Sequence, residues 1–225
     1  MSDQTRLKRY TSLAAAVDML VQQRIALLNP SKWQDTNDTH FLGAFQEQIR
    51  AKSLYAACFT QAAETFHHWR VFAGDSEGVC VEIDREGLLG SLIEGDIKYR
   101  WGDIKYRSLA QLRLRKRINA YELPFLKRLG FGDEKEFRLI YYSSRPQKGV
   151  HYVPIKRAWI KRIVLNPWIG DELFQSMKTA LQSIPSCKSI SIIRTSLIDN
   201  TEWKGACDKV EELPLIRQPP IRSIW

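Results

Sequence analysis

The sequence has no hydrophobic run long enough to cross a membrane. A spanning helix needs about 20 consecutive apolar residues, and Asp18 interrupts the first apolar stretch of this chain. The amino-terminal segment is polar and shows no secretory signal pattern. The cysteines Cys58, Cys80, Cys187 and Cys207 stand alone, without the spacing of zinc sites or disulfide frameworks. We therefore expect a cytoplasmic protein with reduced thiols.

The common catalytic motifs are also missing. The sequence contains no glycine-rich dinucleotide fingerprint, no phosphate-binding loop, no HExxH zinc motif and no GxSxG nucleophile elbow. Four acidic residues near one predicted strand could build a metal site: Asp75, Glu77, Glu82 and Asp84. Acidic residues at turns and strand ends are mostly solvated. A metal-dependent nuclease is therefore only the third alternative for function, and no metal ligand is assigned.

The composition is that of a folded protein with an excess of positive charge. The 225 residues include 34 Lys and Arg against 25 Asp and Glu, a formal net charge of +9, and 44% of the residues are hydrophobic. A chain of this length forms one large domain or two small ones. The positive balance favours a polyanionic partner or an anionic substrate, such as nucleic acid or a nucleotide.

Strands cluster in the centre of the chain rather than alternating with helices. Apolar and alternating segments predict strands at 6–10, 24–28, 53–60, 78–84, 134–142, 149–154, 159–165 and 189–194. Helical spacing predicts helices at 13–23, 66–74, 109–129 and 172–182, with a polar loop at 33–40. The order predicts a single α+β domain over residues 1–195, with a mostly antiparallel or mixed sheet flanked by helices. Residues 196–225 are expected to form a C-terminal arm.

A basic surface is predicted in the second quarter of the chain. The repeat GDIKYR, at 95–100 and 102–107, predicts a β-hairpin that turns at Gly102-Asp103. The hairpin and the helix that follows it carry the basic residues Lys98, Arg100, Lys105, Arg107, Arg113, Arg115, Lys116 and Arg117. These side chains are either simply solvated or in contact with nucleic acid phosphates. The second alternative for function is accordingly a non-catalytic, basic nucleic-acid-binding module.

The strongest chemical pattern is Glu134-x-Glu136-x-Arg138. On a strand, a spacing of two places all three side chains on one face, while Phe137 and Leu139 face the core. Two carboxylates and a guanidinium there form either a salt-bridged solvent face or the wall of a polar cleft. The spacing alone leaves both readings open.

Five motifs occur in an order that resembles a known family. They are KRY at 8–10, ND at 37–38, CFT at 58–60, a block from Trp69 to Asp84, and the E-x-E-x-R strand. Together they resemble the bacterial family called domain of unknown function 2971, over roughly residues 6–180. Thr39, Phe72 and Ile83 depart from the family pattern, which has Pro, Tyr and Phe at these positions.

The layout of that family is in turn similar to the ADP-ribosyltransferase fold, with its split sheet. This resemblance implies NAD as cofactor and Glu136 as the catalytic carboxylate, with Glu134 orienting or deprotonating the acceptor. It further implies a set of cofactor-binding residues: Lys8, Arg9, Tyr10, Trp69 and Arg138. The leading hypothesis is an ADP-ribosyltransferase-like enzyme that cleaves NAD and modifies a nucleic acid or protein acceptor, as a toxin or phage-defence effector.

Overall fold

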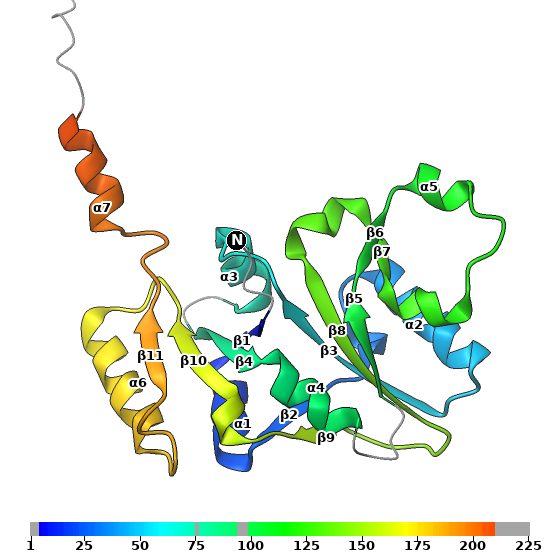
Figure 1. Cartoon of the computed structure of the whole chain (residues 1–225), viewed down its shortest axis with the longest axis horizontal. Coiled ribbons are helices and arrows are strands. Elements are labelled where there is room, and N and C mark those ends of the chain that lie inside the picture. The colour runs from blue at the N-terminus through cyan, green and yellow to red at the C-terminus, as the bar shows by residue number, and fades with distance from the viewer. Residues whose placement is uncertain (1–4, 75–76, 94–98, 210–225) are drawn as a thin grey trace, which may run out of the picture.

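A seven-stranded sheet forms the centre of the computed structural model, which describes residues 5–74, 77–93 and 99–209 (Figure 1). The strands lie in the order β11-β10-β4-β1-β3-β8-β5, and all neighbours are antiparallel except β10 and β11. Their bounds are β1 Arg6–Ser12, β3 Ser53–Thr60, β4 Gly78–Asp84, β5 Tyr99–Asp103, β8 Glu136–Ser143, β10 Ile160–Leu165 and β11 Ser191–Arg194. The predicted α+β class is confirmed.

Helices and two small sheets surround the central sheet. The α-helices are α1 Leu13–Gln22, α2 Thr36–Gln48, α3 Phe66–Phe72, α4 Arg85–Ile93, α5 Leu109–Arg113, α6 Asp171–Ser183 and α7 Thr201–Lys204. The small sheets pair β2 (Arg24–Leu27) with β9 (His151–Pro154) and β6 (Lys105–Arg107) with β7 (Leu126–Arg128). Short 3-10 helices cover Pro30–Lys32, Ala120–Phe125, Leu129–Glu134, Arg157–Trp159 and Gly205–Lys209.

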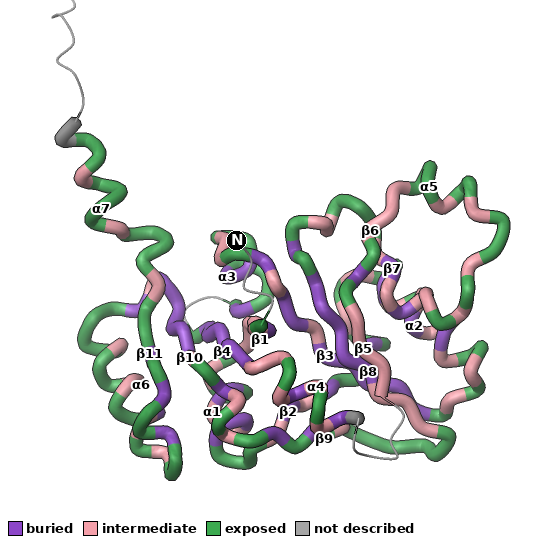
Figure 2. The backbone as a smooth tube through the Cα atoms, viewed as in Figure 1, coloured by how far each residue is buried: buried purple, intermediate pink, exposed green. Residues whose placement is uncertain are grey.

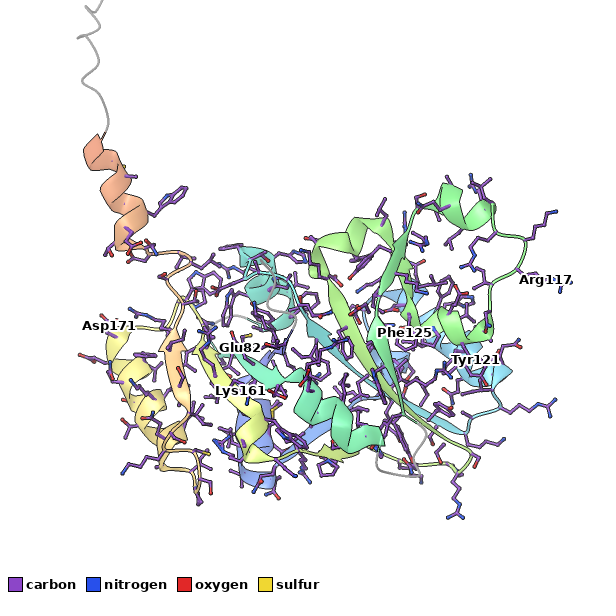
Figure 3. All side chains as sticks on the ribbon, viewed as in Figure 1. Glu82, Arg117, Tyr121, Phe125, Lys161 and Asp171 are labelled. Carbon is purple, nitrogen blue, oxygen red and sulfur yellow. The ribbon has the colours of Figure 1, made fainter. Side chains whose placement is uncertain are left out.

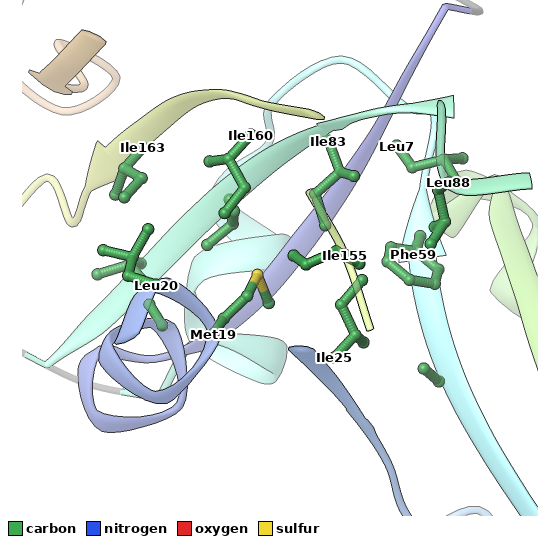
Figure 4. Close-up of a cluster of buried hydrophobic side chains, with 14 of the residues drawn as sticks. Leu7, Met19, Leu20, Ile25, Phe59, Ile83, Leu88, Ile155, Ile160 and Ile163 are labelled. Atoms are coloured by element: carbon green, nitrogen blue, oxygen red, sulfur yellow. The ribbon is translucent and has the colours of Figure 1, made fainter. Parts of the chain in front are cut away.

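Side chains alternate between the two faces of the sheet, and both faces are covered. On one face the largest apolar cluster includes Leu7 and Ile83 of the sheet and Met19 of α1 (Figure 4). On the opposite face α2 contributes Phe45 and α3 contributes Trp69. Figure 2 shows that the buried residues concentrate along the central strands. Burial of apolar area on both faces, at about 25 cal/mol per Å², is the main force that holds these layers together.

The central sheet is split between β1 and β3. Strand β1 pairs with β4 along its whole length, from Arg6↔Asp84 to Ser12↔Gly78, and β3 pairs with β8 over all eight of its residues. Between β1 and β3, in contrast, the register contains one residue pair, Lys8↔Thr60. The two halves of the sheet therefore separate beside this contact, which leaves room for a cavity at the middle of the molecule.

Most predicted elements are confirmed, including the strands over β1, β3, β4 and β10 and the helices over α1, α3 and α6. The predicted loop at 33–40 is wrong, because α2 begins at Thr36. The Asp35 carboxylate accepts hydrogen bonds from the backbone N–H groups of Asn37 and Asp38 and so caps this helix.

The predicted hairpin at 95–107 is also wrong. Gly102 and Asp103 lie inside β5 and pair with Arg138 and Phe137 of β8, so they do not form a turn. The second copy of the repeat, β6, pairs in parallel with β7. Lys98 lies outside the described residues. The two copies share a sequence that favours strands, but each pairs with a different distant partner.

The long basic helix predicted at 109–129 is replaced by three short elements. Helix α5 ends at Arg113, a 3-10 helix containing Pro124 follows, and β7 then begins at Leu126. Proline removes a backbone donor and disrupts a longer helix.

Within the part of the chain that is described, no helix combines the length and apolar character of a membrane span.

Candidate active site at the split in the sheet

A cavity of about 770 Å³ opens at the split between β1 and β3. Its walls come from β1, β3, the segment 28–38, the end of α3, and the residues Lys127, Phe131, Glu134 and Glu136. This volume lies within the range of pockets that bind small molecules and cofactors. The cavity therefore brings together residues from five separate parts of the sequence.

Glu136 is held at the wall of the cavity with both carboxylate oxygens engaged. Arg138 Nε donates to Oε1 at 2.8 Å, and Lys127 Nζ donates to Oε2 at 3.2 Å. Burial disfavours the charged form, but the charges of Arg138 and Lys127 outweigh it, so the pKa of Glu136 lies below its ordinary value. The site thus contains a fixed, ionised carboxylate.

Glu134 lies beside Glu136 but not on the same strand. It is the last residue of the 3-10 helix Leu129–Glu134, and Lys135 turns the chain into β8 with a left-handed φ of 41°. Lys127 Nζ lies 2.6 Å from Glu134 Oε2, so one ammonium group bridges the two carboxylates. Burial raises the pKa of Glu134, and the hydrogen bond from Lys127 offsets this only in part. The two neighbouring carboxyls therefore differ in proton affinity.

Arg138 does not line the cavity. Its side chain is 0% exposed, and its guanidinium donates to Glu136, to both oxygens of Asp38 and to the carbonyl of Pro124. The reading of E-x-E-x-R as a solvent face is therefore wrong, since all three side chains are buried. Arg138 supports the carboxylate from behind the wall rather than facing a cofactor.

Lys8 and Arg9 both line the cavity, although neighbouring residues of a strand point to opposite faces. Both side chains reach the cavity because β1 pairs with β3 at one residue only, which leaves this edge of β1 open. Lys8 Nζ donates to the Ala62 carbonyl at 2.9 Å, and Arg9 donates to the carbonyls of Cys58 and Ala26 at 3.2 and 3.4 Å. Neither cation forms an ion pair with an acid of the described chain.

Arg9 is consequently a cation in a confined place that has no counter-charge among the described residues. Burial lowers the pKa of its guanidinium, which means that the charged form loses hydration that its two carbonyl partners do not fully replace. Arg9 is half-buried, and a partly desolvated charge of this kind is costly unless it is paired. The site therefore favours an anionic ligand beside Arg9.

Tyr10 lines the cavity and Trp69 does not. One face of the Tyr10 ring stacks on His68, with centroids 5.1 Å apart and planes 11° apart, and Trp69 packs edge-on against it at 5.1 Å. Trp69 is fully buried, and its Nε1 donates to Glu64 at 2.6 Å. Trp69 thus fixes the Tyr10 ring rather than forming a wall of the cavity.

Lys127, Asp38 and Cys58 are site residues beyond those predicted from the sequence. Lys127 lies within the range 109–129 that the sequence predicts as a helix, yet it joins the two carboxylates. The Cys58 thiol contributes a hydrogen bond to Glu136, and burial, followed by the charge of Glu136, raises its pKa, so the thiol stays protonated. Asp38 and Cys58 lie in the ND and CFT motifs, and the Asp35 cap begins the helix that places Asp38. No sequence signal indicates the role of Lys127.

The acidic residues proposed for a metal site are used otherwise. The Glu82 carboxylate accepts from Arg6 at 2.9 Å and from Arg162 at 2.7 Å, and Asp84 lies 3.4 Å from Lys161. Asp75 lies outside the described residues. Across the described ranges, no group of three His, Cys, Asp or Glu side chains could hold a metal ion.

No family model matches the chain, and no curated protein does either. The chain is similar to solved structures of DarT from Thermus sp. 2.9. In complex with NAD+, DarT is 10% identical, with a TM-score of 0.46 over 86% of this chain and 96% of that one. In complex with ADP-ribosylated ssDNA, the TM-score is 0.44 at 10% identity over 85% and 94%.

A third DarT structure, in complex with carba-NAD+, gives a TM-score of 0.44 at 10% identity over 87% of this chain and 97% of that one. Likeness of this degree concerns the backbone fold alone. The resemblance to the domain of unknown function 2971 family accordingly stays a prediction from its motifs.

Proposed function

We propose that the protein is an ADP-ribosyltransferase that cleaves NAD in the cavity at the split. The observation that carries this proposal is that one cavity contains an ionised, fixed Glu136 and two cations, Lys8 and Arg9, that have no acidic partner in the described part of the chain. Cleavage of a dinucleotide such as NAD uses both kinds of group, a carboxylate near the reacting sugar and a cation near the pyrophosphate. A pyrophosphate beside Arg9 supplies the missing counter-charge, since guanidinium pairs well with phosphate oxygens.

Glu136 then acts on the ribose that carries nicotinamide. Cleavage of the nicotinamide–ribose bond builds positive charge on the sugar, as in glycoside hydrolysis. A preorganised carboxylate stabilises this charge more in the transition state than in the ground state, which is the condition for catalysis. Because Arg138 and Lys127 keep Glu136 ionised, the carboxylate is ready before the substrate binds.

Glu134 is proposed as the group that receives the proton of the acceptor. Neighbouring carboxyls with different proton affinities are typical of a division between an electrostatic stabiliser and an acid or base. Burial raises the pKa of Glu134, while Glu136 stays ionised. Tyr10 lines the cavity, and an aromatic ring there suits stacking on nicotinamide.

The division between the two carboxyls predicts the pH dependence of the reaction. Glu134 must lose its proton to act as a base. The rate of acceptor modification should therefore rise with pH, and the midpoint of this rise in the pH–rate profile should lie above 4.5, the ordinary pKa of Glu. Glu134→Gln should lower acceptor modification by about 10²–10⁴-fold and remove this rise, which pH–rate profiles of both proteins would measure. A rise that persists unchanged in the variant belongs to another group.

A nucleic acid acceptor is favoured by the segment between β5 and β8. This segment, residues 104–135, carries Lys127, Phe131 and Glu134 into the cavity and exposed cations on its outer side. Those cations include Arg113, Lys116, Arg117 and Arg128; Arg117 lies at the outer rim in Figure 3. Arg115 is paired with Glu122 at 2.7 Å. The site and a basic surface thus share one segment, although the predicted hairpin and long helix are absent.

Binding of single-stranded nucleic acid should therefore depend steeply on salt. Replacing Lys116 and Arg117 with Gln should lower the slope of log affinity against log salt by about 1.4, since each phosphate contact contributes about 0.7 on a single strand. The matched control replaces Lys178 and Lys188, near the opposite edge of the sheet, and should leave the slope unchanged. If the slope of log affinity against log salt is the same in all three proteins, this surface does not contact nucleic acid phosphates.

The proposed reaction is tested directly by its products. Incubation with NAD labelled in the ADP-ribose group should release nicotinamide and transfer label to DNA, RNA or protein, as measured by mass spectrometry. Because cleavage of NAD or modification of nucleic acid harms the cell that contains the enzyme, we extend the proposal to a toxin or phage-defence effector. Absence of NAD consumption with all three acceptor classes would contradict the proposed function.

A further inference from the structure

Asp38 is a buried acid at the wall of the cavity, and both of its oxygens are engaged by Arg138 rather than free for a ligand. It lies in the first turn of α2 and is 4% exposed. Its two oxygens accept from Nη1 and Nη2 of Arg138 at 2.8 and 2.7 Å, a bidentate pair formed across 100 residues of sequence. Pairs of this geometry fix the plane of the guanidinium.

The other edge of the same guanidinium faces Glu136. Nε lies 2.8 Å and Nη2 lies 2.7 Å from Glu136 Oε1, and Nη1 also donates to the Pro124 carbonyl at 2.8 Å. The Trp33 ring lies 5.3 Å from the guanidinium carbon. Arg138 is therefore enclosed by partners, and the plane set by Asp38 determines where Glu136 Oε1 is held.

We propose that Asp38 is a positioning residue for Glu136 and acts through Arg138. This inference rests on the proposed function, because it assigns Asp38 a part in NAD cleavage. Asp38 fixes Arg138, Arg138 fixes Oε1, and Lys127 fixes Oε2, so the carboxylate presents one orientation to the cavity. Loss of Asp38 should disturb this orientation and leave the NAD-binding cations Lys8 and Arg9 in place.

The kinetic test uses Asp38→Asn. The amide N–H group of asparagine meets an N–H group of Arg138, so one of the two hydrogen bonds becomes a clash of donors. We expect kcat for nicotinamide release to fall about 10- to 100-fold with KM for NAD changed by no more than about threefold. Asp18→Asn is the control, because Asp18 forms a similar bidentate pair with Arg24 on the surface; its kcat should match the parent.

A double-variant cycle separates positioning from a general loss of stability. If Asp38 acts through Glu136, then Asp38→Asn should cause no further loss of kcat in a Glu136→Gln background. Additive losses would overturn the proposal. If Asp38→Asn does not fold, Asp38→Glu replaces it, since it keeps the charge and displaces the carboxylate by one methylene; it should give a smaller loss with the same non-additivity.

A structural readout decides the role of Asp38 independently of activity. In crystal structures of the parent and of the folded Asp38 variant, we expect the 2.8 Å contact between Arg138 Nε and Glu136 Oε1 to persist in the parent and to lengthen or divide between conformers in the variant. An unchanged single conformer of Glu136 in the variant overturns the inference. If the parent protein neither binds nor cleaves NAD, the proposed function is contradicted. In that case the crystal structures of the parent and the variant still show whether Asp38 positions Glu136.

Discussion

Glu136→Gln should lower the rate of NAD cleavage by about 10²–10³-fold, the effect expected for loss of one preorganised electrostatic group. Gln keeps the shape of the side chain and loses its charge. Lys127 and Arg138 each retain one other carboxylate, Glu134 and Asp38, so neither cation is left unpaired. We therefore expect a loss of only about 1–3 kcal/mol in the free energy of unfolding. Nicotinamide release and thermal melting measure the two effects.

Glu82→Gln is the matched control for this variant. Glu82 is 3% exposed and, like Glu136, is held by two cations, here Arg6 and Arg162. It does not line the cavity. Glu82→Gln should therefore lose a similar amount of stability and retain NAD cleavage. If both variants lose activity equally, the loss reflects stability rather than the chemistry of Glu136.

Arg9→Met should have opposite effects on ligand binding and on stability. It removes a charge-assisted contact to the pyrophosphate, worth about 1.5–3 kcal/mol, so NAD affinity should fall about 10- to 150-fold. It also removes a desolvated cation that lacks an acidic partner among the described residues, so the melting temperature without NAD should be the same or higher. Saturating NAD should raise the melting temperature of the parent far more than that of the variant.

Arg24→Met provides the comparison for Arg9→Met. Arg24 is paired with Asp18 at 2.8 Å on the surface and lies outside the cavity lining. Its replacement should leave the NAD-dependent rise in melting temperature intact. If NAD raises the melting temperature of the Arg9 variant as much as that of the parent, Arg9 does not contact the ligand.

The elements predicted correctly are those whose signal is local. In β4, Val79, Val81 and Ile83 alternate with polar residues, and all three lie in the main core. In β8 the same alternation separates Phe137 from Glu136 and so indicates which residues face the site. Strand period and side-chain chemistry are properties of the sequence alone.

The errors lie where the structure depends on distant partners. Both copies of GDIKYR have the local character of strands, but β5 pairs with β8 and β6 with β7, and no turn chemistry indicates either choice. The parallel pairing of β6 with β7 also explains why Lys127 reaches the cavity rather than lying on a solvated helix. Pairing of this kind is decided by packing, which single-sequence propensity does not capture.

The candidate site likewise combines residues that the sequence predicts with residues that only tertiary packing brings there. Glu134 and Glu136 both line the cavity as the E-x-E-x-R pattern predicts, but Glu134 does so from the end of a 3-10 helix rather than from the predicted strand. The first strand supplies Lys8, Arg9 and Tyr10 to the same cavity. Its deeper parts were not predictable: Asp38 lies 100 residues from Arg138, and the complete burial of Arg138 follows from how α2 packs on the sheet. Spacing identifies the residues on a face, but tertiary packing decides which of them reach the ligand.

The most direct test is a structure of the protein with a non-hydrolysable NAD analogue bound. We expect the pyrophosphate to lie within hydrogen-bond distance of Arg9 and a hydroxyl of the nicotinamide ribose to lie within hydrogen-bond distance of Glu136. An analogue that binds outside the cavity, or inside it with the ribose directed away from Glu136, would contradict the proposed role of this site.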